Sequence, residues 1–181
     1  KGNHNLENVL FIIGIGKILN IPNEVIAQFL KTTKALEHRL ENFFLKQNTL
    51  FINDSKGTNV ESTIKAIEAF KNRIVLIAGG ENKKICNEEL IKKINERVGF
   101  VYLIGETGTI LAEEMNKVGY KKYKNLGTLE KVLLDIKQNI DFEDSQTILF
   151  SPATASFDQF KNFEERGRIF KELTNKILGE K

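Results

Sequence analysis

Three apolar runs in the second half of the chain place the strongest limit on its fold. Residues 74–78, 100–104 and 147–150 are nearly continuously apolar rather than alternating, and each is short. Continuous apolar strands are typical of a sheet that is covered on both faces, and such sheets are usually parallel. The runs therefore favour a parallel β-sheet buried between layers of helices.

Helical patterns separate these strands, as repeated βα units require. Two earlier strand patterns are joined only by residues 46–49, which predicts a hairpin and one antiparallel edge strand. The alternation predicts a doubly wound α/β domain with a mostly parallel sheet of about six strands and helices on both faces. The remaining predicted strands are residues 43–45, 50–53 and, more weakly, 120–123; the predicted helices are residues 60–71, 88–97, 108–117, 129–139 and 160–177.

The beginning of the chain has a different pattern. Residues 5–19 are apolar on nearly all sides and should form a buried helix, and a second helix with one apolar face should follow Pro22. Two short helices cannot make a core alone. We therefore expect them to belong to a domain whose remainder lies upstream, and the lack of an initiator methionine agrees with a fragment.

The composition limits the partners and the compartment. Acidic residues offset most of the lysines and arginines, so a net charge of +3 argues against nucleic acid as a partner. The single cysteine, Cys86, cannot form an internal disulfide and fits a reducing compartment. The sequence shows neither a signal peptide nor an apolar run of membrane-spanning length. We expect a cytoplasmic protein that is not inserted in a membrane.

Polar residues gather where three of the predicted strands end. Residues 54–59, 79–84 and 151–156 are small, polar or charged. In an open parallel sheet, ligands bind beyond the carboxyl ends of the strands, where lysines, hydroxyls and helix N-termini suit an anion. Gly79 and Gly80 could equally form a plain turn, and residues 151–156 a helix cap, whereas residues 54–59 exceed what a cap needs. The sequence thus predicts a site for a carboxylate or phosphate ligand.

Five motifs together resemble the Mur ligases, in particular the members that add D-glutamate. They are KGNHNLEN (residues 1–8), HRLE (38–41), INDSKGTN (52–59), AGGENKK (78–84) and SPATASFDQFKNFEERG (151–167), in this order. The resemblance covers essentially the whole chain. It implies a Rossmann-like C-terminal domain at residues 36–181, preceded at residues 1–35 by the helical tail of a central ATP-binding domain.

The resemblance also implies a reaction and a set of site residues. ATP phosphorylates a substrate carboxylate, and the amine of D-glutamate attacks the acyl phosphate. Arg39 is then the arginine that reaches the nucleotide phosphates, and Lys56 is the lysine between nucleotide and amino acid. Asn5 and Asn8 match adenine contacts, and Asp54 matches a ribose contact. The residues implied to hold the D-glutamate carboxylates are Thr58, Lys83, Ser156, Phe157 and Phe163.

Some of these residues have plainer explanations. Asn5 and Asn8 could cap a helix, and Arg39 could form a surface ion pair. Core or structural positions are expected for Phe157, Phe163, Asp158, Gln159 and residues 164–166.

The family places the phosphate loop, the Mg²⁺ ligands and most of the UDP-N-acetylmuramoyl-L-alanine site upstream of this chain. We therefore expect the full-length protein, a monomer, to use ATP and Mg²⁺, and this chain alone to be inactive and without a metal site. The sheet-edge pattern by itself leaves an alternative open, a free-standing α/β module that binds an anionic metabolite without chemistry.

Overall fold

The computed structural model describes residues 3–32, 36–81 and 88–179, with side chains from residue 9 onward. These residues form two compact units, Lys1–Leu36 and Glu37–Lys181. Within the described parts, none of the helices is long and apolar enough to cross a membrane.

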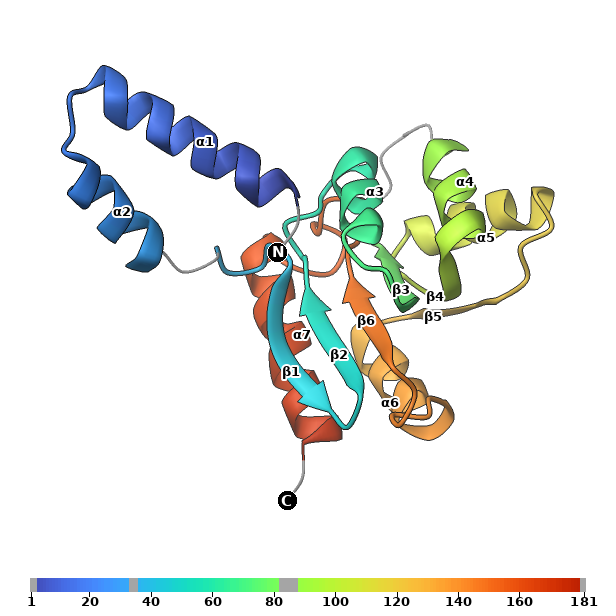
Figure 1. Ribbon diagram of the computed structural model, residues 1–181. Helices are drawn as coiled ribbons and strands as arrows, with labels where there is room; N and C mark the ends of the chain where they lie inside the picture. The colour runs from blue at the N-terminus through green and yellow to red at the C-terminus, as the bar shows by residue number, and fades with distance from the viewer. Residues whose placement is uncertain (1–2, 33–35, 82–87, 180–181) are drawn as a thin grey trace. The chain divides into compact units, whose positions relative to one another are not determined.

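The second unit is built on one six-stranded sheet (Figure 1). The first two strands pair antiparallel, and every other neighbouring pair is parallel. The predicted fold class is confirmed, including the antiparallel edge strand. In their order across the sheet, the strands are β1 (Glu41–Lys46), β2 (Thr49–Asn53), β6 (Gln146–Phe150), β3 (Arg73–Gly79), β4 (Val98–Ile104) and β5 (Tyr123–Gly127).

Helices cover both faces of this sheet, which explains why its strands are apolar on both sides. Successive residues of β3 show the division: Leu76 packs with the helices of one face, and Ile77 packs with those of the other. The first face carries α3 (Val60–Glu68), α4 (Glu88–Arg97) and α5 (Thr107–Lys117), and the second carries α6 (Leu129–Asn139) and α7 (Phe163–Leu178).

The helix expected at residues 60–71 ends at Glu68, and two further predicted boundaries are wrong, each for a local reason. The weak strand expected at residues 120–123 lies at Tyr123–Gly127, because Tyr120 instead packs into the core from the preceding turn and donates a hydrogen bond to the Val98 carbonyl. The last helix begins at Phe163 rather than at residue 160, because the Asn162 side chain caps it by accepting a hydrogen bond from the Glu165 amide at 2.8 Å.

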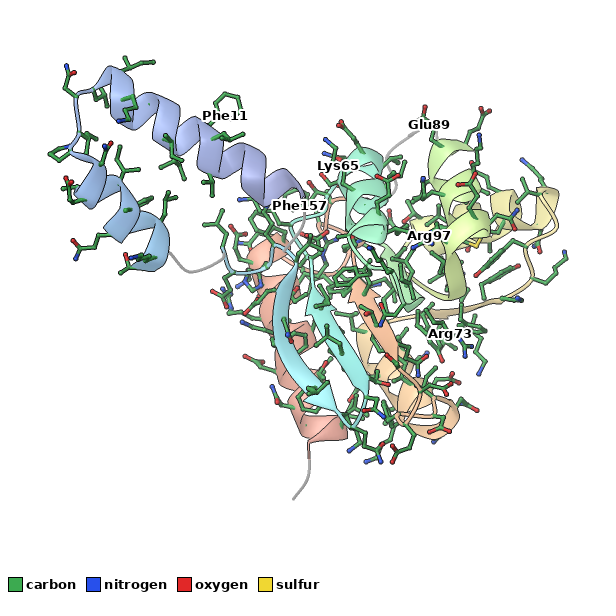
Figure 2. All side chains as sticks on the ribbon, viewed as in Figure 1. Phe11, Lys65, Arg73, Glu89, Arg97 and Phe157 are labelled. Carbon is green, nitrogen blue, oxygen red and sulfur yellow. The ribbon has the colours of Figure 1, made fainter. Side chains whose placement is uncertain are left out.

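The first unit is a pair of helices, α1 (Asn3–Ile18) and α2 (Asn23–Thr32). The prediction that α1 is buried is wrong for this chain. Phe11, which is labelled in Figure 2, is 73% exposed, and Ile18 is 80% exposed. One helix of ten residues covers only part of a helix that is apolar nearly all round, so most of its apolar surface stays in solvent.

Candidate functional site

The carboxyl ends of β2, β6 and β3 bring the three polar stretches together. Asn53 of β2 and Ile77 of β3 are both in register with Phe150 of β6. Backbone hydrogen bonds then join the loops beyond the strands. The Ala153 amide donates to the Gly57 carbonyl at 2.9 Å, and the Gly79 amide donates to the Pro152 carbonyl at 2.8 Å. The structure therefore builds one surface from the three stretches.

Asp54 lies at the centre of this junction and is buried. Its Oδ1 accepts a hydrogen bond from the Leu40 amide at 3.1 Å, and its Oδ2 accepts one from the Ser151 hydroxyl at 2.7 Å. Burial raises the pKa of Asp54 to about 6, although these hydrogen bonds oppose the rise. Each carboxylate oxygen of Asp54 has a second lone pair that could accept a further hydrogen bond, and the ribose contact stays a prediction. Asp54 already links three segments of the domain.

We expect Asp54→Asn to change how stability depends on pH. The pKa of Asp54 in the folded chain lies above its unfolded value of about 4, so its stabilising contribution is complete below that pH and is lost as the pH rises through about 6. Asparagine does not titrate. From pH 4 to pH 7 the free energy of unfolding of the variant should therefore increase by about 2 kcal/mol relative to that of the unsubstituted chain.

Urea denaturation of both proteins across this pH range measures the difference. Burial also lowers the pKa of His38, which acts in the opposite direction, but His38 is present in both proteins and cancels. A constant difference between the two stability curves would contradict the expected titration of Asp54.

Arg39 sits between two residues with unusual backbone geometry. His38 has φ 63° and Leu40 has φ 45°, both in the left-handed region that residues other than glycine rarely adopt. Such strain persists only when the surroundings fix it. The His38 carbonyl accepts a hydrogen bond from the Lys56 amide at 3.0 Å, and Leu40 is bound by Asp54. The turn thus presents the exposed side chain of Arg39 from a fixed backbone.

The His38 ring is fixed as well. It is 3% exposed, and its Nδ1 lies 2.9 Å from the Asn53 amide nitrogen, which can donate to the neutral ring. The ring lies so close to Gly167 of α7 that a methyl group there would overlap it. Asn53 also donates to the Gly167 carbonyl at 3.2 Å. Helix α7 therefore sets the position of the turn that carries Arg39.

Lys56 and Thr58 occupy the loop between β2 and α3. Lys56 is exposed, and its Nζ lies 5.6 Å from the centre of the Phe163 ring. Thr58 is half-buried. Gly57 between them is required, because a methyl group there would come within 2.6 Å of Asp54 Oδ2 and 2.7 Å of the Ser151 hydroxyl. Asn59 ends the loop as the cap of α3, its side chain accepting from the Ser62 amide.

The loop after β6 places the remaining described site residues. Ser156 is buried, and its carbonyl accepts from the Gln159 and Phe160 amides. The expectation that Phe157 is a core residue is wrong, since its side chain is 64% exposed (Figure 2). Phe163, the first residue of α7, is half-buried beneath Lys56. Lys83 lies outside the described residues, as do the side chains of Asn5 and Asn8.

Arg166 is the residue whose importance the sequence reading missed. The sequence predicts only a structural role for residues 164–166, whereas Arg166 is completely buried at the junction of the loops. A signal was available: Arg166 lies three residues after Phe163 and four before Phe170, on the inner face of the last helix. A cation at such a position predicts a buried, hydrogen-bonded charge.

One group of metal-ligand type occurs among the described residues, formed by Glu37, His38 and Glu41. It does not fit Mg²⁺, because Lys171 Nζ already binds both carboxylates, Glu37 at 2.6 Å and Glu41 at 2.9 Å. His38 is a further mismatch, since Mg²⁺ prefers oxygen ligands.

Several known proteins are similar to this chain in sequence. Residues 38–154 match the family model described as "Mur ligase, glutamate ligase domain". A relative from Fusobacterium nucleatum is 45% identical over 99% of this chain, one from Caldicellulosiruptor bescii is 40% identical over 98%, and one from a Thermoanaerobacter species is 44% identical over 97%. All three are named UDP-N-acetylmuramoylalanine–D-glutamate ligase. The chain spans only about two fifths of their lengths, 42%, 38% and 39%.

Solved structures of other ligases share the fold. A MurF ligase from Thermotoga maritima in complex with ADP has a TM-score of 0.57 at 16% identity, covering 91% of this chain and 37% of that protein. A folylpolyglutamate synthase from the same organism has a TM-score of 0.58 at 16% identity, covering 85% of this chain and 37% of that protein. At this identity the likeness concerns the fold alone.

Proposed function

Because this chain belongs to the Mur ligase family, we propose that it is the C-terminal part of an ATP-dependent ligase that adds D-glutamate to UDP-N-acetylmuramoyl-L-alanine in cytoplasmic peptidoglycan synthesis. The convergence of three polar loops on one sheet edge is the observation that carries the proposal. That edge is where parallel α/β sheets bind ligands. The relatives' shared name supplies the substrate, and the exposed cations Arg39 and Lys56 suit anionic ligands.

In the proposed reaction, the γ-phosphoryl group of ATP is transferred to the carboxylate of UDP-N-acetylmuramoyl-L-alanine. The amine of D-glutamate attacks the acyl carbon, an amide bond forms, and phosphate leaves with the electron pair of the broken C–O bond. The protein mainly positions the reactants and stabilises charge. Arg39 would bind the nucleotide phosphates, and Lys56 would lie between the phosphates and the amino acid.

The other residues of the proposal divide between the two ligands. Asp54 would contact the ribose, and Asn5 and Asn8 the adenine. Residues 1–35 would then end the ATP-binding domain, and residues 36–181 would form the amino-acid domain. The residues proposed to hold the D-glutamate carboxylates are Thr58, Lys83, Ser156, Phe157 and Phe163.

We propose that the Mg²⁺ that such a reaction uses is held by residues outside this chain. Among the described residues, the group of Glu37, His38 and Glu41 is bound by Lys171 instead. We propose that the full-length ligase acts as a monomer and that this chain alone is inactive. The direct test of the function is D-glutamate-dependent formation of ADP and phosphate by the full-length protein with UDP-N-acetylmuramoyl-L-alanine. Binding of the ligands without turnover would instead support the alternative function, a free-standing α/β module that binds an anionic metabolite.

We expect Lys83→Ala in the full-length protein to raise KM for D-glutamate about 10- to 100-fold with kcat less affected. The reason is the loss of a charge-assisted hydrogen bond to a substrate carboxylate, which is worth about 1.5–3 kcal/mol. Initial rates of phosphate release at varied D-glutamate measure it. Lys92→Ala, which removes an exposed lysine of α4, is the control and should leave KM unchanged. An unaltered KM in Lys83→Ala would exclude the assigned role.

A further inference from the structure

Arg166 joins the two loops that carry most of the proposed D-glutamate contacts. Its side chain is fully buried in the first part of α7. The Nε group donates to the Ser55 hydroxyl at 3.0 Å, and Nη2 donates to the Ser55 carbonyl at 2.8 Å. The Nη1 group donates to the carbonyls of Thr154 at 3.0 Å and Ala155 at 3.1 Å. The rigid fork of arginine thus binds two backbone segments at once.

This guanidinium is buried, and the charges of Asp158 and Asp54 act on it only from a distance. Among the described residues it forms no ion pair with a carboxylate, and its hydrogen bonds go to neutral oxygens. Burying a charge in this way is costly, and a well-packed apolar side chain usually stabilises a core better. Stability alone is therefore a poor explanation for an arginine at this position.

The loop after β6 is held mainly by groups of other segments, and the Ala155 carbonyl accepts from the Glu81 amide at 3.0 Å as well as from Arg166. Ala153 has φ 64°, a left-handed conformation that an alanine rarely adopts. The Thr154 hydroxyl is buried and has no hydrogen-bond partner within the described parts of the chain. Side-chain hydrogen bonds to the carbonyls of Thr154 and Ala155 come from Arg166. The shape of the loop therefore depends on groups outside it.

We propose that Arg166 is a positioning residue that sets the spacing between the Ser55–Thr58 loop and the Thr154–Phe157 loop, and thereby orients D-glutamate at both of its ends. Ser55 directly precedes Lys56, and Ala155 directly precedes Ser156, so the bonds of Arg166 end one residue from each group of proposed contacts. Helix α7 supplies a rigid base for both loops. The substrate part of this inference rests on the proposed function, whereas the bracing of the loops does not.

Hydrogen exchange tests the bracing without any ligand. The amides of Lys56 and Ala153 donate hydrogen bonds across the junction, to the carbonyls of His38 and Gly57, and report its opening. In Arg166→Met we expect peptides containing these amides to exchange about tenfold faster or more, because the loops open locally without unfolding of the sheet. Arg168→Met is the matched control, because it removes an exposed arginine from the same helix.

Kinetics of the full-length ligase test the consequence. Because displacement of a reacting group by about 1 Å costs about 100-fold in rate, Arg166→Met should lower kcat/KM for D-glutamate about 100-fold, with KM for ATP changed less. Arg166→Lys should not restore activity, because lysine keeps the charge but cannot bind both loops. Ser55→Ala removes one hydrogen bond of Arg166 and also the bond that the Ser55 hydroxyl donates to the Phe163 carbonyl at 2.8 Å. Because both bonds tie the Ser55–Thr58 loop to α7, the variant should lower kcat/KM for D-glutamate about five- to tenfold. It keeps the test decisive if Arg166→Met does not fold.

The outcomes separate the inference from the proposed function. Faster exchange in both loops of Arg166→Met and Ser55→Ala, but not of Arg168→Met, supports the bracing role. Unchanged exchange, or a lower melting temperature with kcat/KM for D-glutamate preserved, overturns it. A full-length protein without D-glutamate-dependent phosphate release would refute the proposed function, while the exchange experiment would still decide the bracing.

Discussion

Replacing Lys56 with alanine should lower kcat/KM of the full-length ligase about 100- to 1,000-fold, the size typical of removing one preorganised group that stabilises developing charge. The position of Lys56 is fixed at both ends: its amide donates to the His38 carbonyl, and its ammonium group lies over the Phe163 ring. In the role proposed for Lys56, between nucleotide and amino acid, such a cation would need little reorganisation when charge builds up. Phosphate release with all three substrates measures the loss.

Lys65→Ala is the control for the effect of Lys56. Lys65 is an exposed lysine of α3 and pairs with Glu61 one turn earlier (Figure 2). Removing such a surface pair should cost less than about 1 kcal/mol of stability and should leave kcat/KM unchanged. If Lys56→Ala retained the activity of Lys65→Ala, the cation would have no part in the reaction.

The sheet could be predicted from the sequence because burial on both faces leaves a direct mark on the strands. Val75 and Leu76 face opposite layers of helices and are both completely buried, so apolar residues are needed throughout the inner part of β3, residues 74–78. The edge of the sheet is harder to predict. Strand β5 contains lysine and asparagine and is only partly buried, so its apolar pattern is weak. The buried Tyr120 just before it makes the strand appear to begin three residues too early in the sequence.

The composition of the site could be predicted, but its internal connections could not. Polar residues after β2, β3 and β6 had to meet, because parallel strands end at one edge. The contact of His38 with Gly167 joins residues that lie far apart in the sequence and has no local pattern. The same holds for Arg166 and Ser55, which are separated by 111 positions. Phe157 shows the converse error, since an apolar residue at the mouth of a site need not be buried.

Gly80 gives the last test, because it connects the backbone of β3 with the loop after β6. Its φ is 155°, and a methyl group there would overlap the Ala155 carbonyl and lie 2.6 Å from the Thr154 hydroxyl and 3.2 Å from Arg166 Nη1. Thr107 binds the backbone of Gly80 on both sides. The Gly80 amide donates to the Thr107 hydroxyl oxygen at 2.9 Å, and the Gly80 carbonyl lies 3.0 Å from the Thr107 amide and 3.1 Å from its hydroxyl, so Gly80 cannot move freely. Gly80→Ala should therefore lower the free energy of unfolding by about 3–5 kcal/mol.

Gly119→Ala separates the two causes of this loss. Gly119 also has a positive φ, 77°, but a methyl group there would meet no atom within 4 Å. The free energy of unfolding of Gly119→Ala should fall only by the cost of the left-handed backbone, about 1–2 kcal/mol. Urea denaturation of both variants gives the difference, which measures the crowding at the loop. An equal loss in the two would mean that the loop after β6 yields to the added methyl group, and the rigid packing of Gly80 against Ala155 would be refuted.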